Sequence, residues 1–469
     1  MNAYLLTRSL GIDSAVAFER AQCTQLLHAL HPSNVAFYAQ APQTSLGSEA
    51  YSHATGEPEY AHVAGVNAIT IDKFEGRYLL SGGADSSIAI WDLENSSDGT
   101  ELAYAPIGSV DRTSQQHKFG ITQLCFYPFD SLAFLSSSYD HTVKIYSSET
   151  LEPSASFDLD SVVYTIALSP IASHLLVACA TQHPAVRLVD LRSGASTHSL
   201  AGHNGAVLSV AWSPVHEHIL ASGSADGTVR FWDIRRSVGE IGALDMEDSV
   251  GILGHDGFGG GARHRDHGKA HSGIVNGIAW TEDGQHLVTT GHDERIRVWD
   301  TWTGANTLAS FGPLIRNSHL SSVTPLLAPS NLVSSTKDVL LYPNELDILM
   351  YELFEGTLIK KLKRPARQPT SSTTNPAPGQ RNPRNRVTGL VWRHHHIEFY
   401  SAHSDGSIGT WKPRTSEDAL ADEEEQENME NADAEGKQST KRKREALEDI
   451  YQSLTKRQVT FGSSHESYR

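Results

Sequence analysis

Short apolar runs of strand length recur along this chain, each separated from the next by a tight polar turn. The span LASGSADGTVRFWDIRR, residues 220–236, shows the pattern in full: an apolar run, an Asp-Gly pair, a second run and a terminal Trp-Asp. Asp-Gly is favoured in two-residue hairpins, and the flanking runs have the length and alternation of strands. The pattern therefore predicts antiparallel hairpins.

Near-copies of this span stand elsewhere: LLSGGADSSIAIWDL at residues 79–93 and LVTTGHDERIRVWDT at residues 287–301. Seven blade-like units follow the pattern, at residues 62–92, 117–147, about 158–190, 203–233, 271–300, about 322–352 and 386–412. A repeat that ends in Trp-Asp predicts an all-β fold, a seven-bladed β-propeller.

Each unit has one residue in the place of the tryptophan. These residues are Trp91, Tyr146, Val189, Trp232, Trp299, Tyr351 and Trp411, with spacings of 55, 43, 43, 67, 52 and 60 residues. Two spacings equal the expected period of about 40–45 residues, and the long ones coincide with insertions. The third and sixth units keep least of the pattern, so their blades are inferred from spacing and alternation.

Three units carry the same four side chains at matching spacings. These sets are His62, Ser81, Asp85 and Trp91; His203, Ser222, Asp226 and Trp232; and His271, Thr289, Asp293 and Trp299. They resemble the hydrogen-bonded tetrad of WD40 blades, in which each buried polar group satisfies another. We therefore predict that they fasten the blades and are not hydrolase triads, because the hydroxyl is expected to be buried.

Two further units keep part of this tetrad. The second has His117, Ser136 and Asp140 with Tyr146 in place of tryptophan. The seventh has Ser401, Asp405 and Trp411 without the histidine.

The chain outside the units predicts three domains. We expect residues 1–56 to form an N-terminal helical arm and connector, residues 57–415 the propeller, and residues 416–469 a disordered tail that is first acidic and then basic. Flexible insertions are expected at residues 237–269 and 363–386, which are rich in Gly and in Arg, Pro, Ser and Thr respectively.

The arm holds two further expectations. Asp13 or Ser14 is a candidate cap for a helix that runs to Leu30 without Gly or Pro. A strand from before the first unit should complete the seventh blade, and residues 26–30 and 35–40 are both candidates.

Composition narrows the class of protein. The chain has 38 basic and 55 acidic residues, a formal charge of −17, so net charge does not imply a duplex-wrapping surface. Its three cysteines, far apart and without a CxxC pair, argue for a reducing compartment. No signal peptide and no membrane span are expected.

Two charged clusters have competing interpretations. His255, His264 and His267 lie near His271, but they stand among Gly and Arg, where no fixed metal geometry is expected, so we predict no metal site. The run Lys441, Arg442, Lys443 and Arg444 is a candidate nuclear import signal, with a solvated charged face as the alternative.

Arg235 follows the Trp-Asp of the fourth unit by two positions, just past the expected end of the strand. A planar, permanently charged guanidinium at this place suits anchoring to another protein. The alternative is a surface arginine that satisfies a loop carbonyl, and the residues alone do not decide between them.

Beyond the repeat, three segments closely resemble the Cockayne syndrome group A family: residues 75–97, 200–237 and 270–308. The start MNAYLLTRSLGID is similar to that family's start as well. The resemblance covers roughly residues 1–30 and 60–412, is weakest in the sixth unit, and excludes the insertions and the tail.

The resemblance implies a non-catalytic, nuclear substrate receptor of a cullin-4 RING ubiquitin ligase, without a cofactor. An N-terminal helical segment and the Trp-Asp-x-Arg box would bind the large damaged-DNA-binding adaptor subunit. The residues carried over are Tyr4, Leu5, Arg8, Phe18, Trp232, Asp233 and Arg235. The opposite face would hold stalled RNA polymerase II and its remodelling ATPase in transcription-coupled nucleotide excision repair.

The sequence leaves open whether the chain contacts DNA and which of two functions it has. Direct contact with DNA is neither implied nor excluded. The alternative function is a generic WD40 scaffold for a nuclear complex, in histone or ribosome assembly, without any ligase.

Overall fold

The computed structural model describes residues 15–33, 35–39, 60–94, 103–110, 116–171, 173–194, 196–236, 239–247, 268–333, 338–364 and 386–414. The chain divides into two compact units, Met1–Pro413 and Arg414–Arg469. The first unit contains the whole propeller. The predicted tail and import signal lie outside the described residues, as does most of each predicted insertion.

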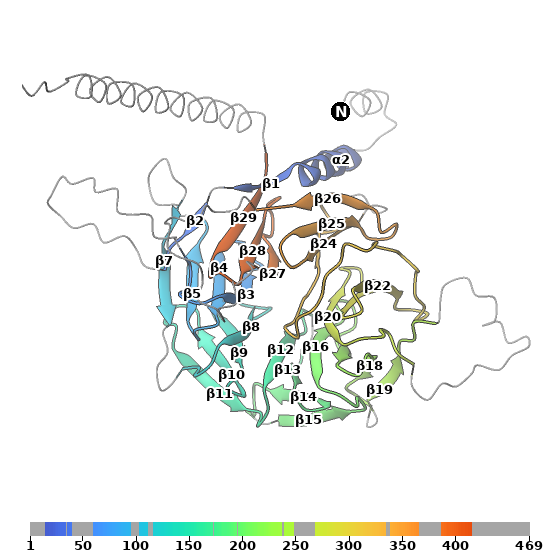
Figure 1. Cartoon of the computed structure of the whole chain (residues 1–469). Helices are drawn as coiled ribbons and strands as arrows, with labels where there is room; N and C mark the ends of the chain where they lie inside the picture. The colour runs from blue at the N-terminus through green and yellow to red at the C-terminus, as the bar shows by residue number, and fades with distance from the viewer. Residues whose placement is uncertain are drawn as a thin grey trace, which may run out of the picture. The chain divides into compact units, whose positions relative to one another are not determined.

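The predicted seven-bladed β-propeller is confirmed (Figure 1). Blade one contains β3 (Val66–Ile71), β4 (Tyr78–Gly83), β5 (Ile88–Asp92) and β7 (Pro106–Val110). Blade two contains β8 (Ile121–Phe126), β9 (Ala133–Ser138), β10 (Thr142–Ser147) and β11 (Pro153–Asp158). Blade three contains β12 (Val163–Leu168), β13 (Leu176–Thr181), β14 (Ala185–Asp190) and β15 (Ser196–Ala201). Blade four contains β16 (Val207–Trp212), β17 (Ile219–Ser224), β18 (Val229–Asp233) and β19 (Glu240–Ala243).

The remaining three blades complete the ring. Blade five contains β20 (Val275–Trp280), β21 (His286–Gly291) and β22 (Arg295–Asp300), and is three-stranded in the described part of the chain. Blade six contains β23 (Leu326–Leu327), β24 (Val339–Pro343), β25 (Ile348–Glu352) and β26 (Leu358–Leu362). Blade seven contains β27 (Val387–Trp392), β28 (Phe399–His403), β29 (Ile408–Pro413) and β1 (Leu30–Ser33). A two-residue parallel pair, β2 (Ala36–Phe37) with β6 (Ala103–Tyr104), lies beside blade one.

The seven residues predicted in the tryptophan position occupy one structural position. Each lies on the third strand of its blade and pairs with a buried residue of the second strand, as Trp91 does with Leu79 and Val189 with Val177. The degenerate sixth blade keeps this register, with Tyr351 opposite Leu340. All seven side chains are at most 1% exposed. The alignment of the weak third and sixth units therefore holds.

The ring closes through β1, which pairs antiparallel with β29, Leu30 opposite Pro413. The closing strand, β1, thus begins at the last residue of the first candidate segment, 26–30. It ends before the second candidate segment, 35–40, begins. Helix α2 (Ala15–His28) takes up most of the first candidate segment. The second contributes Val35 and Phe37 to the core of blade one. The propeller therefore starts well before residue 57, inside the segment expected to be arm and connector.

Helix α2 ends at His28, two residues earlier than expected. Pro32 lies in the following strand, and a residue before proline is biased toward extended backbone. The helix is packed against the propeller, since Leu27 and Leu30 are fully buried in the core shared by blades six and seven. Figure 1 shows α2 beside β26 at the outer edge of the ring. No helix in the described ranges is long and apolar enough to cross a bilayer.

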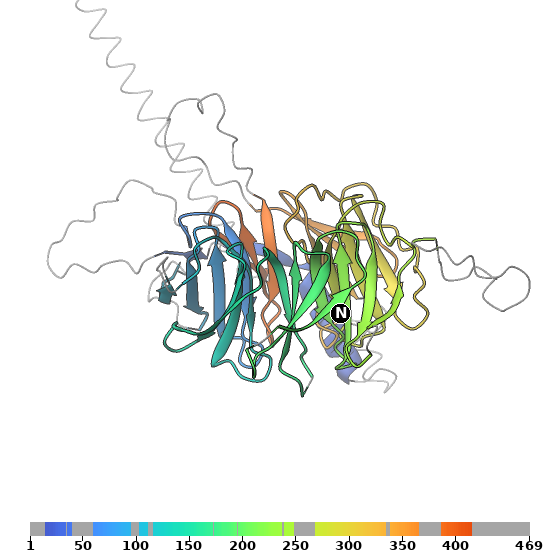
Figure 2. The same ribbon diagram turned by 90° about the horizontal axis from the view of Figure 1, so that it is seen from below.

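One face of the propeller carries the turns between the first and second strands of the blades. Hydrogen bonds join these turns from blade to blade: Arg393 Nε donates to the Gly76 carbonyl at 2.6 Å, and His174 Nε2 to the Glu217 carbonyl at 2.8 Å. Figure 2 shows the ring edge-on, with strands crossing between its two faces. We call this face the AB face; among the described residues, its turns include residues 72–77, 127–132, 169–171 with 173–175, 213–218, 281–285 and 393–398.

Candidate partner-docking site

Blade four shows how the predicted tetrad is built. His203 Nε2 lies 2.6 Å from Ser222 Oγ, which accepts a hydrogen bond from Trp232 Nε1 at 2.7 Å. Asp226 reaches the histidine mainly through Thr228, whose hydroxyl donates to the carboxylate at 2.6 Å and lies 2.8 Å from His203 Nδ1. Ser222 and Trp232 are fully buried. Thr228 was not predicted from the sequence, although a hydroxyl two residues after the aspartate recurs in several units.

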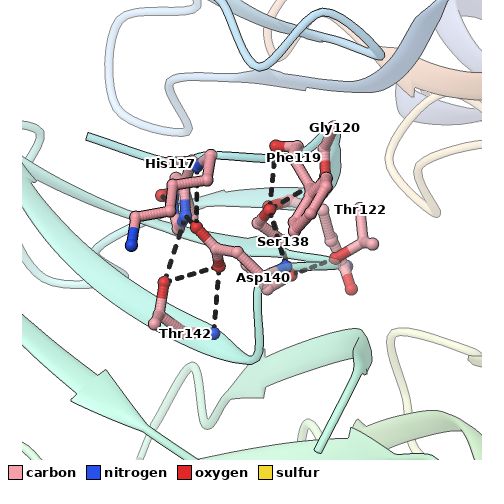
Figure 3. A network of polar contacts seen from close by, with 11 residues as sticks. His117, Phe119, Gly120, Thr122, Ser138, Asp140 and Thr142 are labelled. Atoms are coloured by element: carbon pink, nitrogen blue, oxygen red, sulfur yellow. Dashed lines mark hydrogen bonds and ion pairs between the residues drawn. The ribbon is translucent and has the colours of Figure 1, made fainter. Parts of the chain in front are cut away.

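Blade two holds the same network without a tryptophan, and Figure 3 shows the part formed by His117, Asp140 and Thr142. Here Asp140 contacts His117 Nδ1 directly at 3.0 Å and also accepts from Thr142 at 2.7 Å. His117 Nε2 lies 2.6 Å from Ser136 Oγ. Tyr146 fills the tryptophan position and stacks on Phe134, their ring centroids 5.2 Å apart. The blade therefore keeps the polar fastener and replaces the indole by aromatic packing.

Blade seven corrects one expectation. It was expected to lack the histidine, but His403 lies two residues after Ser401 and places Nε2 2.9 Å from the Ser401 hydroxyl. Trp411 Nε1 donates to the same hydroxyl at 2.9 Å. The histidine enters from β28 instead of from the preceding loop, so it stands outside the position where the repeat pattern places it.

Burial sets the charge states of these networks. Burial lowers the pKa of His62 to about 4, which keeps the imidazole neutral. Burial acts to raise the pKa of Asp226, but the neighbouring His203, 3.8 Å away, and hydrogen bonds from Thr228 and the Asn204 amide outweigh it and hold that pKa well below its usual range. The carboxylate is thus ionised and each of its neighbours is a donor, a state suited to holding the blade together.

The tetrads are closed to substrate. The hydroxyls of Ser81, Ser222 and Thr289 belong to fully buried residues, and each accepts a hydrogen bond from the tryptophan of its blade. A nucleophile needs access to the scissile group and a free base beside it. These side chains therefore act as blade fasteners in the geometry observed.

Arg235 lies in the turn after β18 and forms a two-pronged ion pair with Asp233. Its Nε and Nη2 donate to the two carboxylate oxygens at 3.0 Å each. The Asp233 carboxylate is nearly buried, whereas the Arg235 side chain is 65% exposed. The hydrogen bond raises the pKa of Arg235 and lowers that of Asp233. The partner is therefore a carboxylate and not the loop carbonyl considered above.

Arg235 belongs to the AB face. The turn that carries it is hydrogen-bonded to the turn of residues 213–218, through the Ile234 amide and the His218 carbonyl at 3.2 Å. The β1 end of helix α2 meets the same face, because Leu30 pairs with Pro413 at the far end of β29. Tertiary structure thus brings the end of the N-terminal helix and the predicted arginine to one side of the propeller.

Other predicted site residues lie outside the described residues. These are Tyr4, Leu5, Arg8, the side chain of Phe18, and the run Lys441, Arg442, Lys443 and Arg444. Within the described ranges, no group of three His, Cys, Asp or Glu side chains could hold a metal ion. Trp302 was missed: it occupies the position in blade five that Arg235 occupies in blade four, and it is 93% exposed.

Comparison of the sequence with known proteins shows the family to which the chain belongs. A model of the WD domain, G-beta repeat, matches residues 58–92, 108–147, 194–233 and 265–300. Over 311 residues the chain is 32% identical to the WD repeat-containing protein ATCSA-1 of Arabidopsis thaliana, covering 53% of this chain and 69% of that protein. The chain belongs to the WD40-repeat family. The four matched WD40 segments are blades one, two, four and five, which hold the most complete tetrads.

Two further relatives match a smaller share of the chain. Radiation-sensitive protein 28 of Saccharomyces cerevisiae is 26% identical, covering 42% of this chain and 43% of that protein. The ribosome biogenesis protein YTM1 of Phaeosphaeria nodorum is 28% identical, covering 51% of this chain and 55% of that protein. The chain therefore spans about half the length of these two.

Proposed function

We propose that this WD40 propeller is the substrate receptor of a cullin-4 RING ubiquitin ligase in transcription-coupled nucleotide excision repair. It would present stalled RNA polymerase II and its remodelling ATPase to the ligase. The similarity to ATCSA-1, and to a yeast relative named for radiation sensitivity, supports a role in repair. The structural observation that carries the proposal is the exposed Arg235 guanidinium on the AB face, the face from which α2 enters the propeller.

The geometry of Arg235 suits docking. A guanidinium has five N–H donors, and Asp233 takes one from Nε and one from Nη2. The planar group is held in place by these two bonds, and its remaining donors are not used by Asp233. An arginine fixed in this way loses little conformational freedom when a partner binds. Acidic or carbonyl-rich surfaces of the adaptor are the expected contacts.

The N-terminal arm would supply the second contact. Tyr4, Leu5, Arg8 and Phe18 are proposed to insert into the adaptor, as the family resemblance implies. Leu27 and Leu30 lock the end of α2 into blades six and seven, so the arm starts from a fixed point. Two tethered contacts raise the effective concentration of each for its site.

In this proposal the chain carries no chemistry of its own. Ubiquitin transfer belongs to the attached ligase, and the propeller raises the local concentration of the target beside it. The run Lys441–Arg444 would direct the chain to the nucleus.

Co-purification with the adaptor tests the proposal. Arg235→Ala is expected to reduce adaptor recovery at least about tenfold while the propeller stays folded, because a bidentate arginine anchor is lost. Deletion of residues 1–14 should act in the same direction. The deletion must stop before Ala15, since Leu27 and Leu30 are core residues.

Arg77→Ala is the matched control. Arg77 forms the same two-pronged pair with Asp92 in blade one, at 3.0 and 2.6 Å, but it is only 31% exposed. If both alanine variants bind the adaptor as well as the native chain, the ligase-receptor proposal is wrong. If both lose binding together, Arg235 acts through folding.

The second candidate function is a WD40 scaffold for nuclear assembly without a ligase. The match to ribosome biogenesis protein YTM1 favours it. The same purification separates the two: histones or pre-ribosomal proteins in place of the cullin adaptor would support the scaffold.

A further inference from the structure

Blade five presents an exposed indole where blade four presents its arginine. The sequences Trp232-Asp233-Ile234-Arg235 and Trp299-Asp300-Thr301-Trp302 occupy the same place after the third strand. Trp302 is 93% exposed, whereas the other seven tryptophans are buried or half-buried. Leaving an indole in water is unfavourable, and aromatic side chains of this kind are enriched where proteins bind one another.

Trp302 borders a hollow on the AB face between blades four and five. Its volume is about 430 Å³, and its lining includes Val215, His216, Asp283, His286 and Asp300. Val215 is 50% exposed and adds an apolar wall. The walls come from the turns 213–218 and 281–285 and from the turn after β22. The hollow is large enough for one long side chain together with part of its backbone.

In the described part of the chain, the carboxylates of this hollow are not paired with a cation, whereas the aspartates after the tryptophan in blades one and four are. In blades one and four, the aspartate after the tryptophan is paired with an arginine of the same chain, Arg77 for Asp92 and Arg235 for Asp233. Asp300 instead accepts hydrogen bonds from the Trp302 amide and the Thr303 hydroxyl. Within the described residues, neither Asp300 nor Asp283 has an ion-pair partner at 4.0 Å or less.

The electrostatic potential beside the hollow is negative as well. Burial raises the pKa of Asp338, and the nearby carboxylates of Asp283 and Glu282 raise it further. His286 acts in the opposite direction on this pKa. Asp338, which directly precedes β24, therefore lies near the turn that carries Glu282 and Asp283. An incoming cation would be favoured by this potential and by the face of the indole.

We propose that the hollow beside Trp302 binds an arginine side chain of a partner protein, stacked on the indole and paired with Asp300 or Asp283. An arginine fits better than a lysine because its planar guanidinium stacks on aromatic rings and forks onto a carboxylate. The partner would supply in trans the pairing that Arg235 and Arg77 supply within this chain. This inference does not depend on the proposed ligase role.

Panning of a random dodecapeptide library on phage against the full chain tests this. The selected peptides should be enriched in arginine. A selected synthetic peptide should bind Trp302→Ala at least about tenfold more weakly, and Trp302→Phe nearly as well as the native chain. The bound peptide should also protect the Trp302 fluorescence from quenching by acrylamide. The other tryptophans are less exposed and contribute little to this quenching.

Asp300→Asn and Arg235→Ala complete the set. Asp300→Asn keeps the oxygen that caps the turn but removes the charge, so it should weaken peptide binding and reduce its salt dependence. Arg235→Ala should leave peptide binding unchanged, which separates this site from the proposed adaptor contact. Equal melting temperatures for all variants ensure that folding is not the cause.

Three results would overturn the proposal. One is a set of selected peptides without arginine, or with binding that is indifferent to Trp302→Ala. Another is a native chain that sediments as a dimer and a Trp302→Ala chain that sediments as a monomer, because a second copy would then occupy the hollow. The third is peptide binding that appears only after residues 365–385 are removed, which would make the occupant a segment of this chain.

Discussion

Blades four and five have the same interior and different edges. Both place a histidine, a hydroxyl and a tryptophan in one hydrogen-bonded set, with Trp232 and Trp299 fully buried. In each blade an arginine lies two residues before the tryptophan, but its ion-pair partner differs between the two blades. Arg230 pairs with Glu240 on the fourth strand, β19. Blade five lacks such a strand in the described part of the chain, and its Arg297 pairs with Asp293 of the tetrad at 2.7 Å.

The difference shows which positions the fold requires. The interior set is shared because a buried indole N–H and a buried imidazole must both find partners. The positions after Trp-Asp are free to differ, Arg235 in one blade and Trp302 in the other, because they lie at the surface. A side chain that varies between otherwise equal blades is the place to look for function.

The largest expected effect tests the shared interior. Trp232→Ala and Trp299→Ala should each lower the free energy of unfolding by about 3–5 kcal/mol, since both indoles are fully buried and donate to a hydroxyl. Chemical denaturation measures both values. A large difference between the two would mean that the blades are not equivalent inside. Trp302→Ala is the matched control and should leave the value unchanged.

A smaller effect tests the differing arginines. Arg297→Ala should cost about 1.5–3 kcal/mol, because it removes a charged hydrogen bond from the nearly buried Asp293. Arg230→Ala should cost less than about 1 kcal/mol, because Glu240 is 30% exposed and water can replace the pair. Equal losses would contradict the idea that Arg297 turns to Asp293 because the described part of blade five offers it no fourth strand.

The smallest expected effect is a pH dependence in blade five. Burial lowers the pKa of His271, and Arg297 lowers it further, against the opposing effect of Asp293. The unfolded state then binds more protons than the folded state below about pH 6.5, so stability falls as pH falls through that value. The contribution of this group to the free energy of unfolding should therefore decrease as the pH falls from about 7 to about 5.5.

Denaturation of the native chain and of His271→Gln at several pH values measures this contribution. The variant should show a shallower loss of stability on acidification. Asp293 does not titrate in this window, because its pKa is held well below its usual range. Parallel pH curves for the two proteins would rule out His271 as a source of acid sensitivity.

The sequence predicted the parts of the fold that repeat locally. Seven residues in the tryptophan position could be aligned because strand length and turn chemistry recur, even where Val189 and Tyr351 replace the indole. His403 could not be found in this way, because it reaches Ser401 from a strand and not from the loop that the repeat uses. The closing strand was missed by a few residues, because its partner is almost 400 positions away and leaves no local pattern.

The candidate site likewise has features that the sequence alone determined and features that only the tertiary structure decided. Sequence alone determined that Arg235 follows a Trp-Asp and that Trp302 follows another, since both are properties of neighbouring residues. Only the tertiary structure decided that Arg235 is forked onto Asp233, that it shares a face with the end of α2, and that Trp302 borders a hollow whose aspartates are unpaired in the described ranges. The physical reason is that hydrogen-bonded turns repeat with the chain, whereas a surface is assembled from turns that belong to different blades.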